Sequence, residues 1–167
     1  MTAAPAPGNL PVIDSRAAFV QALRWGLQRS VSLQARRLQL VDADFTLCPR
    51  DDGELLVPLA LWLRLPGRRL GLFAAGYEEV PRRWPRFTAW RRDWGHAIEC
   101  RQLPSEPGPT LPTLLLADCG VSVHLIDAVH WRGRADDTAR TAVVWQEQID
   151  ALLQRSEPAF PADTLGL

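Results

Sequence analysis

The spacing of apolar residues divides the chain into predicted helices and strands. Apolar side chains recur at helical spacing from Ser15 to about Leu33, and they alternate with polar ones from Arg36 to Phe45. The first pattern predicts an amphipathic helix, for which Asp14 and Ser15 offer an N-cap. The second pattern predicts a strand. Residues 1–13 show neither pattern, and we expect them to form a flexible tail.

The middle of the chain repeats this alternation of helix and strand. Pro58 predicts that the second helix begins late or is kinked, and its apolar face carries Leu55, Leu59, Trp62 and Leu63. The apolar run Leu70–Ala75 is typical of a strand buried on both faces. Pro85 fits the first turn of a third helix, whose core-facing residues are Phe87, Trp90 and Trp94. Ala97–Leu103 predicts the next strand, and residues 104–112 a loop.

The C-terminal part predicts a β-hairpin followed by a helix. The apolar segments Thr113–Ala117 and Val121–Ile126 flank a short turn. Residues 136–138 offer a cap for the last helix, whose inner face carries Ala142, Trp145, Ile149 and Leu152. Residues 156–167 are expected to be an extended tail. This order of elements predicts a single α/β domain over residues 14–167, with a mixed β-sheet sandwiched by α-helices.

Composition narrows the classes of function. Nineteen basic residues, all Arg, balance nineteen acidic ones, so no net charge favours a nucleic-acid or membrane partner. The longest apolar run, Leu55–Leu65, is too short to cross a bilayer. The N-terminus lacks the pattern of a secretory signal. The three cysteines, Cys48, Cys100 and Cys119, are widely spaced, which favours reduced thiols over disulfides or a zinc site. We therefore expect a cytoplasmic protein without metal or cofactor.

The order of the elements, with Asp118 in the turn of the hairpin before the last helix, resembles one repeat of the phospholipase D-like superfamily. Short motifs make the chain look like an uncharacterised bacterial branch of that fold. They are Pro85-Arg86-Phe87 with Trp90-Arg91, Gly95-His96, His130-Trp131-Arg132-Gly133, Gln154 to Pro161, and Thr164 to Leu167. The resemblance covers residues 14–167 and implies a phospholipase D-like single repeat.

Active members of that superfamily carry H-x-K-x4-D-x6-G-S on this hairpin. Their histidine attacks phosphorus, their lysine holds the phosphate oxygens, and their aspartate supports the histidine. Only Asp118 matches, because Leu111 and Thr113 stand at the histidine and lysine positions, and Leu125 and Ile126 at the glycine and serine positions. The chain contains no lysine, so no other alignment of the motif would supply one. The resemblance thus implies a degenerate, non-catalytic binding or scaffold module, and a homodimer in which two hairpins meet.

A second hypothesis is a pocket for a small anion or phosphate-bearing metabolite, or an enzyme of another class. His96, Asp118, His130 and Arg132 would form that pocket, with Arg134 as a further anion ligand. The alternative for Asp118, which we favour, is an ordinary turn residue before Gly120 at positive φ. For His96 the dipole at a helix end is a sufficient explanation.

Other polar residues allow two interpretations each. His124, Asp127 and His130 could ligate a metal, but their spacing matches no known motif, and we favour local hydrogen bonds. Asp42 and Asp44 end a strand, where α/β folds place ligands, or else they cap the following turn.

Two segments rich in Arg and aromatic residues are candidate interaction surfaces. Residues 82–92 could bind single-stranded nucleic acid through Arg82, Arg83, Arg86 and Arg92. A solvated helix face explains them better. Trp131, with its neighbouring arginines, could contact an unknown protein partner, or it could cover the core while the arginines pair with Asp136 and Asp137.

Overall fold

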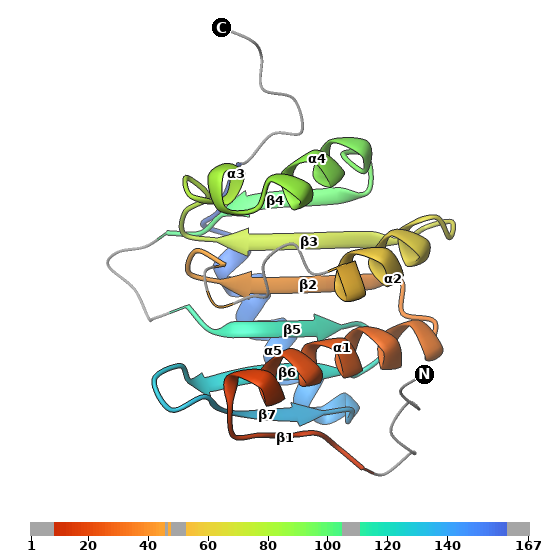
Figure 1. The fold of residues 1–167 in the computed structure, drawn as a ribbon, viewed down its shortest axis with the longest axis vertical. Helices are drawn as coiled ribbons and strands as arrows, with labels where there is room; N and C mark the ends of the chain where they lie inside the picture. Colours follow the sequence, from red (N-terminus) through yellow and green to blue (C-terminus); the bar gives the residue numbers. More distant parts are fainter. Residues whose placement is uncertain (1–8, 46, 48–52, 105–110, 160–167) are drawn as a thin grey trace, which may run out of the picture.

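One eight-stranded sheet organises the computed structural model, which describes residues 9–45, 47, 53–104 and 111–159 (Figure 1). Its strand order is β1-β7-β6-β5-β2-β3-β4-β8. The strands are β1 (Val12–Ile13), β2 (Arg37–Asp42), β3 (Arg69–Ala74), β4 (Ile98–Gln102), β5 (Thr113–Ala117), β6 (Ser122–Asp127), β7 (Arg132–Asp136) and β8 (Glu157–Pro158).

The sheet is mixed, and its pairing gives each end a distinct set of residues. Strands β2, β3 and β4 are parallel, whereas β5, β6 and β7 continue from β2 in antiparallel fashion. We name the end at which β2, β3 and β4 finish the carboxyl edge, and the end at which they begin the amino edge. Strands β5 and β7 therefore start at the carboxyl edge, and β6 ends there.

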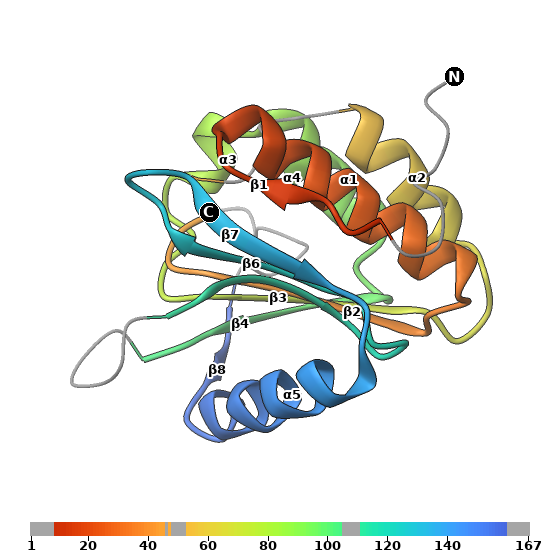
Figure 2. The same cartoon turned by 90° about the horizontal axis from the view of Figure 1, so that it is seen from below.

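Helices cover both faces of the sheet. Figure 2 shows α1 (Arg16–Ser32), α2 (Gly53–Leu63), α3 (Val80–Arg83) and α4 (Pro85–Asp93) on one face and α5 (Ala139–Leu153) on the other. The core is accordingly divided in two. The larger layer lies under α1–α4, and the smaller one packs Val41, Phe73, Leu114 and Leu116 of the sheet against Ile149 of α5. None of the described helices is both long and apolar enough to cross a membrane.

Local chemistry explains where α1 begins and how closely it packs. The Ser15 hydroxyl oxygen accepts the Ala18 N–H at 3.0 Å, which caps the helix as predicted. Gly26 then allows a close approach to the hairpin, because a Cβ there would lie 2.7 Å from Cδ2 of Leu115. Pro58 lies inside α2, whose start at Gly53 precedes it by more than a turn.

The structure corrects several predicted boundaries. The predicted tail ends early, since Val12–Ile13 pair with β7. The polar segment after the hairpin is a strand, β7. It lies near the rim of the sheet and its first side chains are exposed, so its sequence lacks the alternation of apolar and polar residues that predicts a strand. At the other rim, Glu157–Pro158 pair with β4 rather than forming a tail. The predicted third helix is preceded by the short α3, with a break at Trp84. Cys48 and the last motif, Thr164 to Leu167, lie outside the described residues.

Candidate functional site

Four of the five positions that correspond to the superfamily motif, those of Leu111, Thr113, Leu125 and Ile126, lie at the carboxyl edge. Thr113 and Leu125 are register partners on β5 and β6. Leu125 is buried under α1, Leu111 packs against the core on the α5 side, and Ile126 is 64% exposed. The edge thus presents a hydroxyl and three aliphatic side chains where the superfamily motif has a nucleophile, a cation, a glycine and a serine.

Thr113 is engaged with a buried carboxyl group. Its hydroxyl donates to Oδ1 of Asp42 at 2.6 Å, while Oδ2 has no hydrogen-bond partner within the described part of the chain. Asp42 is only 2% exposed. Burial raises the pKa of the Asp42 carboxyl, although hydrogen bonds from Thr113 and from backbone N–H groups act to lower it. Of the two acids that end β2, Asp42 is therefore buried, and Asp44 is exposed.

Asp118 lies at the opposite edge and has a structural role. Its Oδ1 accepts the Arg36 N–H at 3.0 Å, and its own N–H donates to the Arg37 carbonyl oxygen at 3.1 Å. Gly120 adopts a φ of +102°, as the turn requires. The length of β5, about 17 Å at the usual rise per residue, separates Asp118 from Leu111. Asp118 therefore lies far from Leu111, and its hydrogen bonds are those of a residue that stabilises a turn.

The residues of the hypothetical anion pocket do not converge. His96 precedes β4 at the amino edge, and β2 and β3 separate its strand from that of Asp118, by about 14 Å at the usual strand spacing. His130 and Arg132 lie at the carboxyl edge. Arg134 pairs with Asp136 at 3.0 Å. The structure thus does not bring these five residues into one pocket.

The turn between β6 and β7 is closed by Asp127. One carboxylate oxygen accepts the N–H groups of Val129 and His130 at 2.9 and 3.1 Å, and the other lies 2.8 Å from Nδ1 of His130. The side-chain contact with His130 is the main cause that lowers the pKa of Asp127. His124 instead faces Trp145 of α5, with ring centroids 4.5 Å apart. Within the described residues no three His, Cys, Asp or Glu side chains cluster as a metal site would require.

Trp131 covers part of the core. Its backbone has a φ of 53°, and its ring packs 5.9 Å from that of Phe19 in α1. Asp137 forms an ion pair with Arg29 rather than with a neighbour on β7. Trp131 therefore contributes to packing, and it does not project as an isolated exposed anchor.

The arginine-rich segment is largely engaged within the protein. Arg82 and Arg83 both contact Glu79, at 2.6 and 3.4 Å. Arg91 is buried, and its Nε donates to Sγ of Cys100 at 3.2 Å. Trp90 and Phe87 pack against the core. The segment therefore presents less free positive charge than its sequence indicates.

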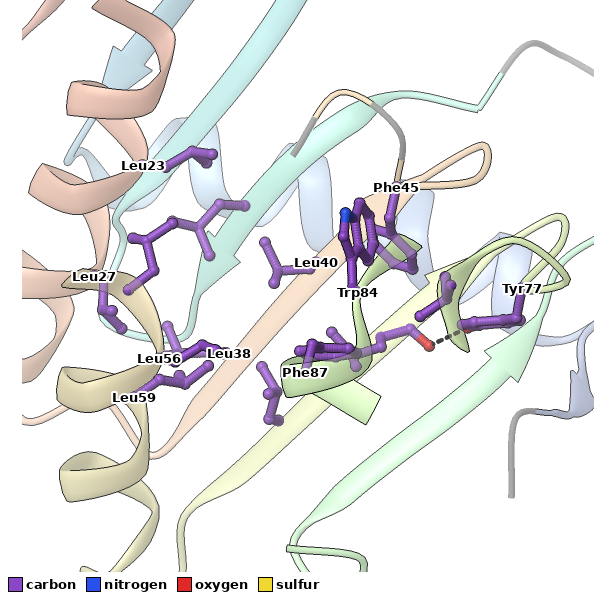
Figure 3. Close-up of a pocket in the computed structure, with 15 residues that line it drawn as sticks. Leu23, Leu27, Leu38, Leu40, Phe45, Leu56, Leu59, Tyr77, Trp84 and Phe87 are labelled. Carbon is purple, nitrogen blue, oxygen red and sulfur yellow. Dashed lines mark hydrogen bonds between the residues drawn. The ribbon is translucent and has the colours of Figure 1, made fainter. Parts of the chain in front are cut away.

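An apolar cavity lies between the sheet and helices α1, α2 and α4 (Figure 3). Its volume is about 120 Å³. Leucines of α1, α2, β2, β3 and β5 line it, together with Phe45, Tyr77, Val80, Trp84 and Phe87. Sequence reasoning missed this site because each lining residue matches the pattern of an ordinary core position. Only the packing of distant segments shows that they leave a space.

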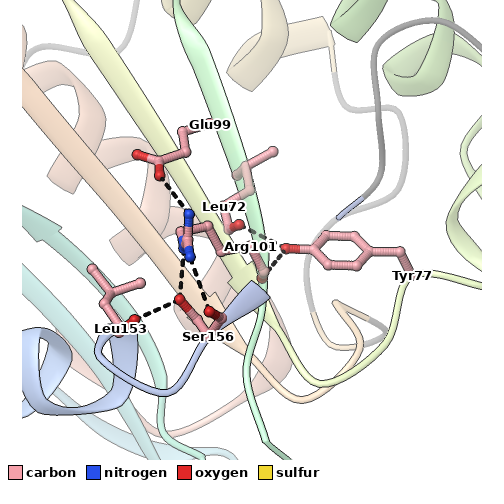
Figure 4. Close-up of polar contacts among 6 residues, drawn as sticks. All are labelled: Leu72, Tyr77, Glu99, Arg101, Leu153 and Ser156. Atoms are coloured by element: carbon pink, nitrogen blue, oxygen red, sulfur yellow. Dashed lines mark hydrogen bonds and ion pairs between the residues drawn. The ribbon is translucent and has the colours of Figure 1, made fainter. Parts of the chain in front are cut away.

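One end of the cavity is held by a polar network (Figure 4). The Tyr77 hydroxyl lies 2.6 Å from the Leu72 carbonyl oxygen and 2.7 Å from that of Arg101, so it has an acceptor on each of two neighbouring strands. Burial raises the pKa of Tyr77. The Arg101 guanidinium donates to the hydroxyl and carbonyl oxygens of Ser156, at 2.6 and 2.9 Å. The network fixes β3, β4 and the segment after α5 relative to one another.

Comparisons with known proteins agree on the fold. No protein-family model matches the sequence, and the search of curated proteins gives no match. Three solved structures are similar. TrmBL2, an archaeal chromatin protein described as showing a novel mode of DNA binding, has 13% identity and a TM-score of 0.53, over 82% of this chain and 52% of its own. Nuc, a phospholipase D family member from Salmonella typhimurium, has 9% identity and a TM-score of 0.50, over 78% and 90%.

The third is phosphatidylserine synthase from Haemophilus influenzae Rd KW20, with 14% identity and a TM-score of 0.53, over 85% of this chain and 37% of its own. The chain thus spans about half the length of TrmBL2. All three identities are low, and a likeness at this level extends to architecture alone. The chain therefore has a phospholipase D-like α/β fold.

Proposed function

We propose that the chain is a non-catalytic phospholipase D-like domain that acts as a cytoplasmic binding module. The observation that carries the proposal is the composition of the carboxyl edge. Cleavage by the superfamily mechanism needs a nucleophile on phosphorus and a cation on its oxygens. Leu111 and Thr113 supply neither, and the Thr113 hydroxyl is directed to Asp42. The free thiols of Cys100 and Cys119 are consistent with a reducing compartment.

The proposal includes a homodimer that forms through the carboxyl edge. Ile126 and Val129 expose apolar side chains there, at 64% and 83%. Burial of such side chains against a second copy would be favourable. Light scattering over a concentration series tests this: we expect a dimer for the wild type and a monomer for Ile126→Glu with Val129→Glu. A wild type that stays monomeric at high concentration would remove the dimer from the proposal.

The competing functions have less support. An anion pocket would require His96 and Asp118 to meet His130 and Arg132, which the sheet places at its opposite edge. Nucleic-acid binding through residues 82–92 would compete with the ion pairs to Glu79 and with the burial of Arg91. The DNA binding described for TrmBL2 belongs to a protein of which the match covers only 52%.

Hydrolysis of bis(4-nitrophenyl) phosphate tests the lack of catalysis. We expect the purified wild type to release nitrophenol no faster than buffer, with or without EDTA. Asp118→Ala and Thr113→Val serve as matched controls, since one alters the amino edge and the other the carboxyl edge. Turnover that co-purifies with the wild type and disappears in either variant would overturn the proposal.

A further inference from the structure

We propose that the apolar cavity under α1, α2 and α4 binds a small neutral molecule with a mainly apolar body and one hydrogen-bond acceptor, to which the indole N–H of Trp84 donates. The inference deepens the proposed function and rests on it, because it names the class of ligand that the binding module takes. It concerns a different part of the fold from the degenerate carboxyl edge.

The size and lining of the cavity define the body of the ligand. A cavity of about 150 Å³ lined by aliphatic and aromatic side chains stays dry and accepts benzene, and the cavity here measures about 120 Å³. The helices α1 and α2 and the strand β2 line it with leucines, among them Leu23, Leu59 and Leu40. None of the described lining residues is charged, which excludes a phosphate or a carboxylate. A compact ring or a short branched chain fits this environment.

Trp84 defines the polar part of the ligand. Its side chain is 6% exposed, and its Nε1 is buried without a hydrogen-bond partner among the residues that the structure describes. In Figure 3 the indole nitrogen lies on the ring edge nearer to Leu23 and Leu40 and away from Tyr77. A buried donor without an acceptor is unfavourable. A ligand that brings one acceptor into the cavity removes that penalty.

Neighbouring groups hold the indole in place but do not accept a hydrogen bond from its N–H. The rings of Phe45 and Phe87 lie 6.4 and 6.3 Å from that of Trp84. The Tyr77 hydroxyl already has the carbonyl oxygens of Leu72 and Arg101. A bound water needs two to four polar partners, which this lining does not offer. An acceptor on a largely apolar molecule is therefore a better match for Trp84 than water.

The lining residues also indicate an entrance. Leu55 and Leu56 of α2 and Phe87 of α4 are only half-buried. They form the rim of the cavity between the two helices, whereas the leucines of β3 and β5 at its base are buried. This rim is therefore the more exposed side of the cavity, and the proposal takes it as the entrance.

The test uses two probes of equal shape, cyclohexanone and methylenecyclohexane, added to the ¹⁵N-labelled full chain. Only the ketone carries an acceptor. Trp84→Phe, which removes the donor and keeps a ring, identifies the Trp84 indole resonance by its loss. We expect cyclohexanone to shift that resonance saturably and to bind about fivefold or more tighter than methylenecyclohexane, as one buried hydrogen bond allows. Trp84→Phe should abolish this preference.

A filled cavity provides the control. Leu40→Phe occupies the space and should eliminate binding of both probes, whereas Val143→Phe, on the exposed face of α5, should leave binding unchanged. If Trp84→Phe fails to fold, the affinities of the two probes for the wild type and for Leu40→Phe still test the inference. Equal binding of the probes, no saturable binding, or binding unaffected by Leu40→Phe would overturn the inference.

The phosphodiesterase assay on the same preparations separates the two proposals. If the protein neither hydrolyses the phosphodiester nor binds the probes, the proposal of a non-catalytic domain stands and the proposal of a cavity ligand is refuted. Turnover that depends on the carboxyl edge refutes the proposed function, whatever the result in the cavity.

Discussion

The Thr113 hydroxyl donates a 2.6 Å hydrogen bond to the carboxyl group of Asp42, where β2 ends and β5 begins. These residues lie 71 positions apart in the sequence. They face each other because β5 pairs antiparallel to β2, so that the end of one strand meets the start of the other. The contact places a buried acid at the edge where the superfamily motif would place its histidine and lysine.

Asp42 should make stability depend on pH. Burial raises its pKa in the folded protein, so the folded state binds a proton more tightly than the unfolded state does. This contribution to the free energy of unfolding is complete below the unfolded pKa and is lost as the pH rises through the folded pKa. Asp42→Asn should therefore stabilise the protein at pH 7, with a gain that shrinks towards pH 3.

Urea unfolding of Asp42→Asn and wild type from pH 3 to pH 8 measures this difference. Asp44→Asn removes a nearby charge at an exposed position and serves as the control, without the same trend. If Asp42→Asn is less stable than the wild type at pH 7, the ionised carboxylate is favoured in the fold and the argument is wrong.

Asp118 should contribute to stability as an acceptor and not through its charge. Its Oδ1 receives the Arg36 N–H at 3.0 Å. Asp118→Ala removes that acceptor and should lower the free energy of unfolding by about 1 kcal/mol. Asp118→Asn keeps an oxygen at the same position and should lose much less. Equal losses in the two variants, measured by urea unfolding at pH 7, would show that charge dominates.

Gly133 should not tolerate a side chain. A Cβ at this position would lie 2.5 Å from the backbone oxygen of His124, which cannot move without disturbing the pairing of β6 with β7. Gly133→Ala should destabilise the protein by about 1–3 kcal/mol. The matched control is Gly53→Ala, where nothing lies within 4 Å of the added Cβ, and it should be neutral or mildly stabilising. Thermal unfolding of both variants compares these effects. Equal unfolding midpoints would contradict the close approach of Gly133 to the backbone oxygen of His124.

Tyr77 should stabilise the sheet through its hydroxyl group. Tyr77→Phe keeps the ring but leaves the Leu72 and Arg101 carbonyl oxygens without that donor. We expect a loss of about 1 kcal/mol or more in the free energy of unfolding, because these groups are shielded from water. Hydrogen exchange should show weaker protection in β3 and β4. Unchanged stability and exchange would mean that solvent replaces the hydroxyl.

The sequence predicts elements whose signals are local. Ser15 caps α1, and the apolar strands around Gly120 form the predicted hairpin, because each pattern depends on residues close together in the chain. Strand β7 was missed because its position near the rim of the sheet leaves its first residues exposed. Its pairing with Val12–Ile13 joins segments more than a hundred residues apart, which no local pattern records.

The candidate sites depended even more on tertiary structure. Sequence alone located the positions that correspond to the superfamily motif, since the spacing of Leu111, Thr113 and Asp118 can be counted. It did not reveal that β5 holds Asp118 at the far edge, or that Asp42 would face Thr113. The unpartnered indole of Trp84 was equally hidden, because the sequence does not show whether the N–H of a buried Trp has an acceptor. Whether a buried polar group has a hydrogen-bond partner depends on the packed structure.

Single-turnover hydrolysis, with the protein in molar excess over a fluorescent phosphodiester, tests the central claim most directly. Excess protein converts even one slow event per active site into detectable product. We predict that product accumulates at the rate of buffer alone for the wild type and for Asp118→Ala. Product formed by the wild type in proportion to its concentration, and lost in Thr113→Val, would contradict the account.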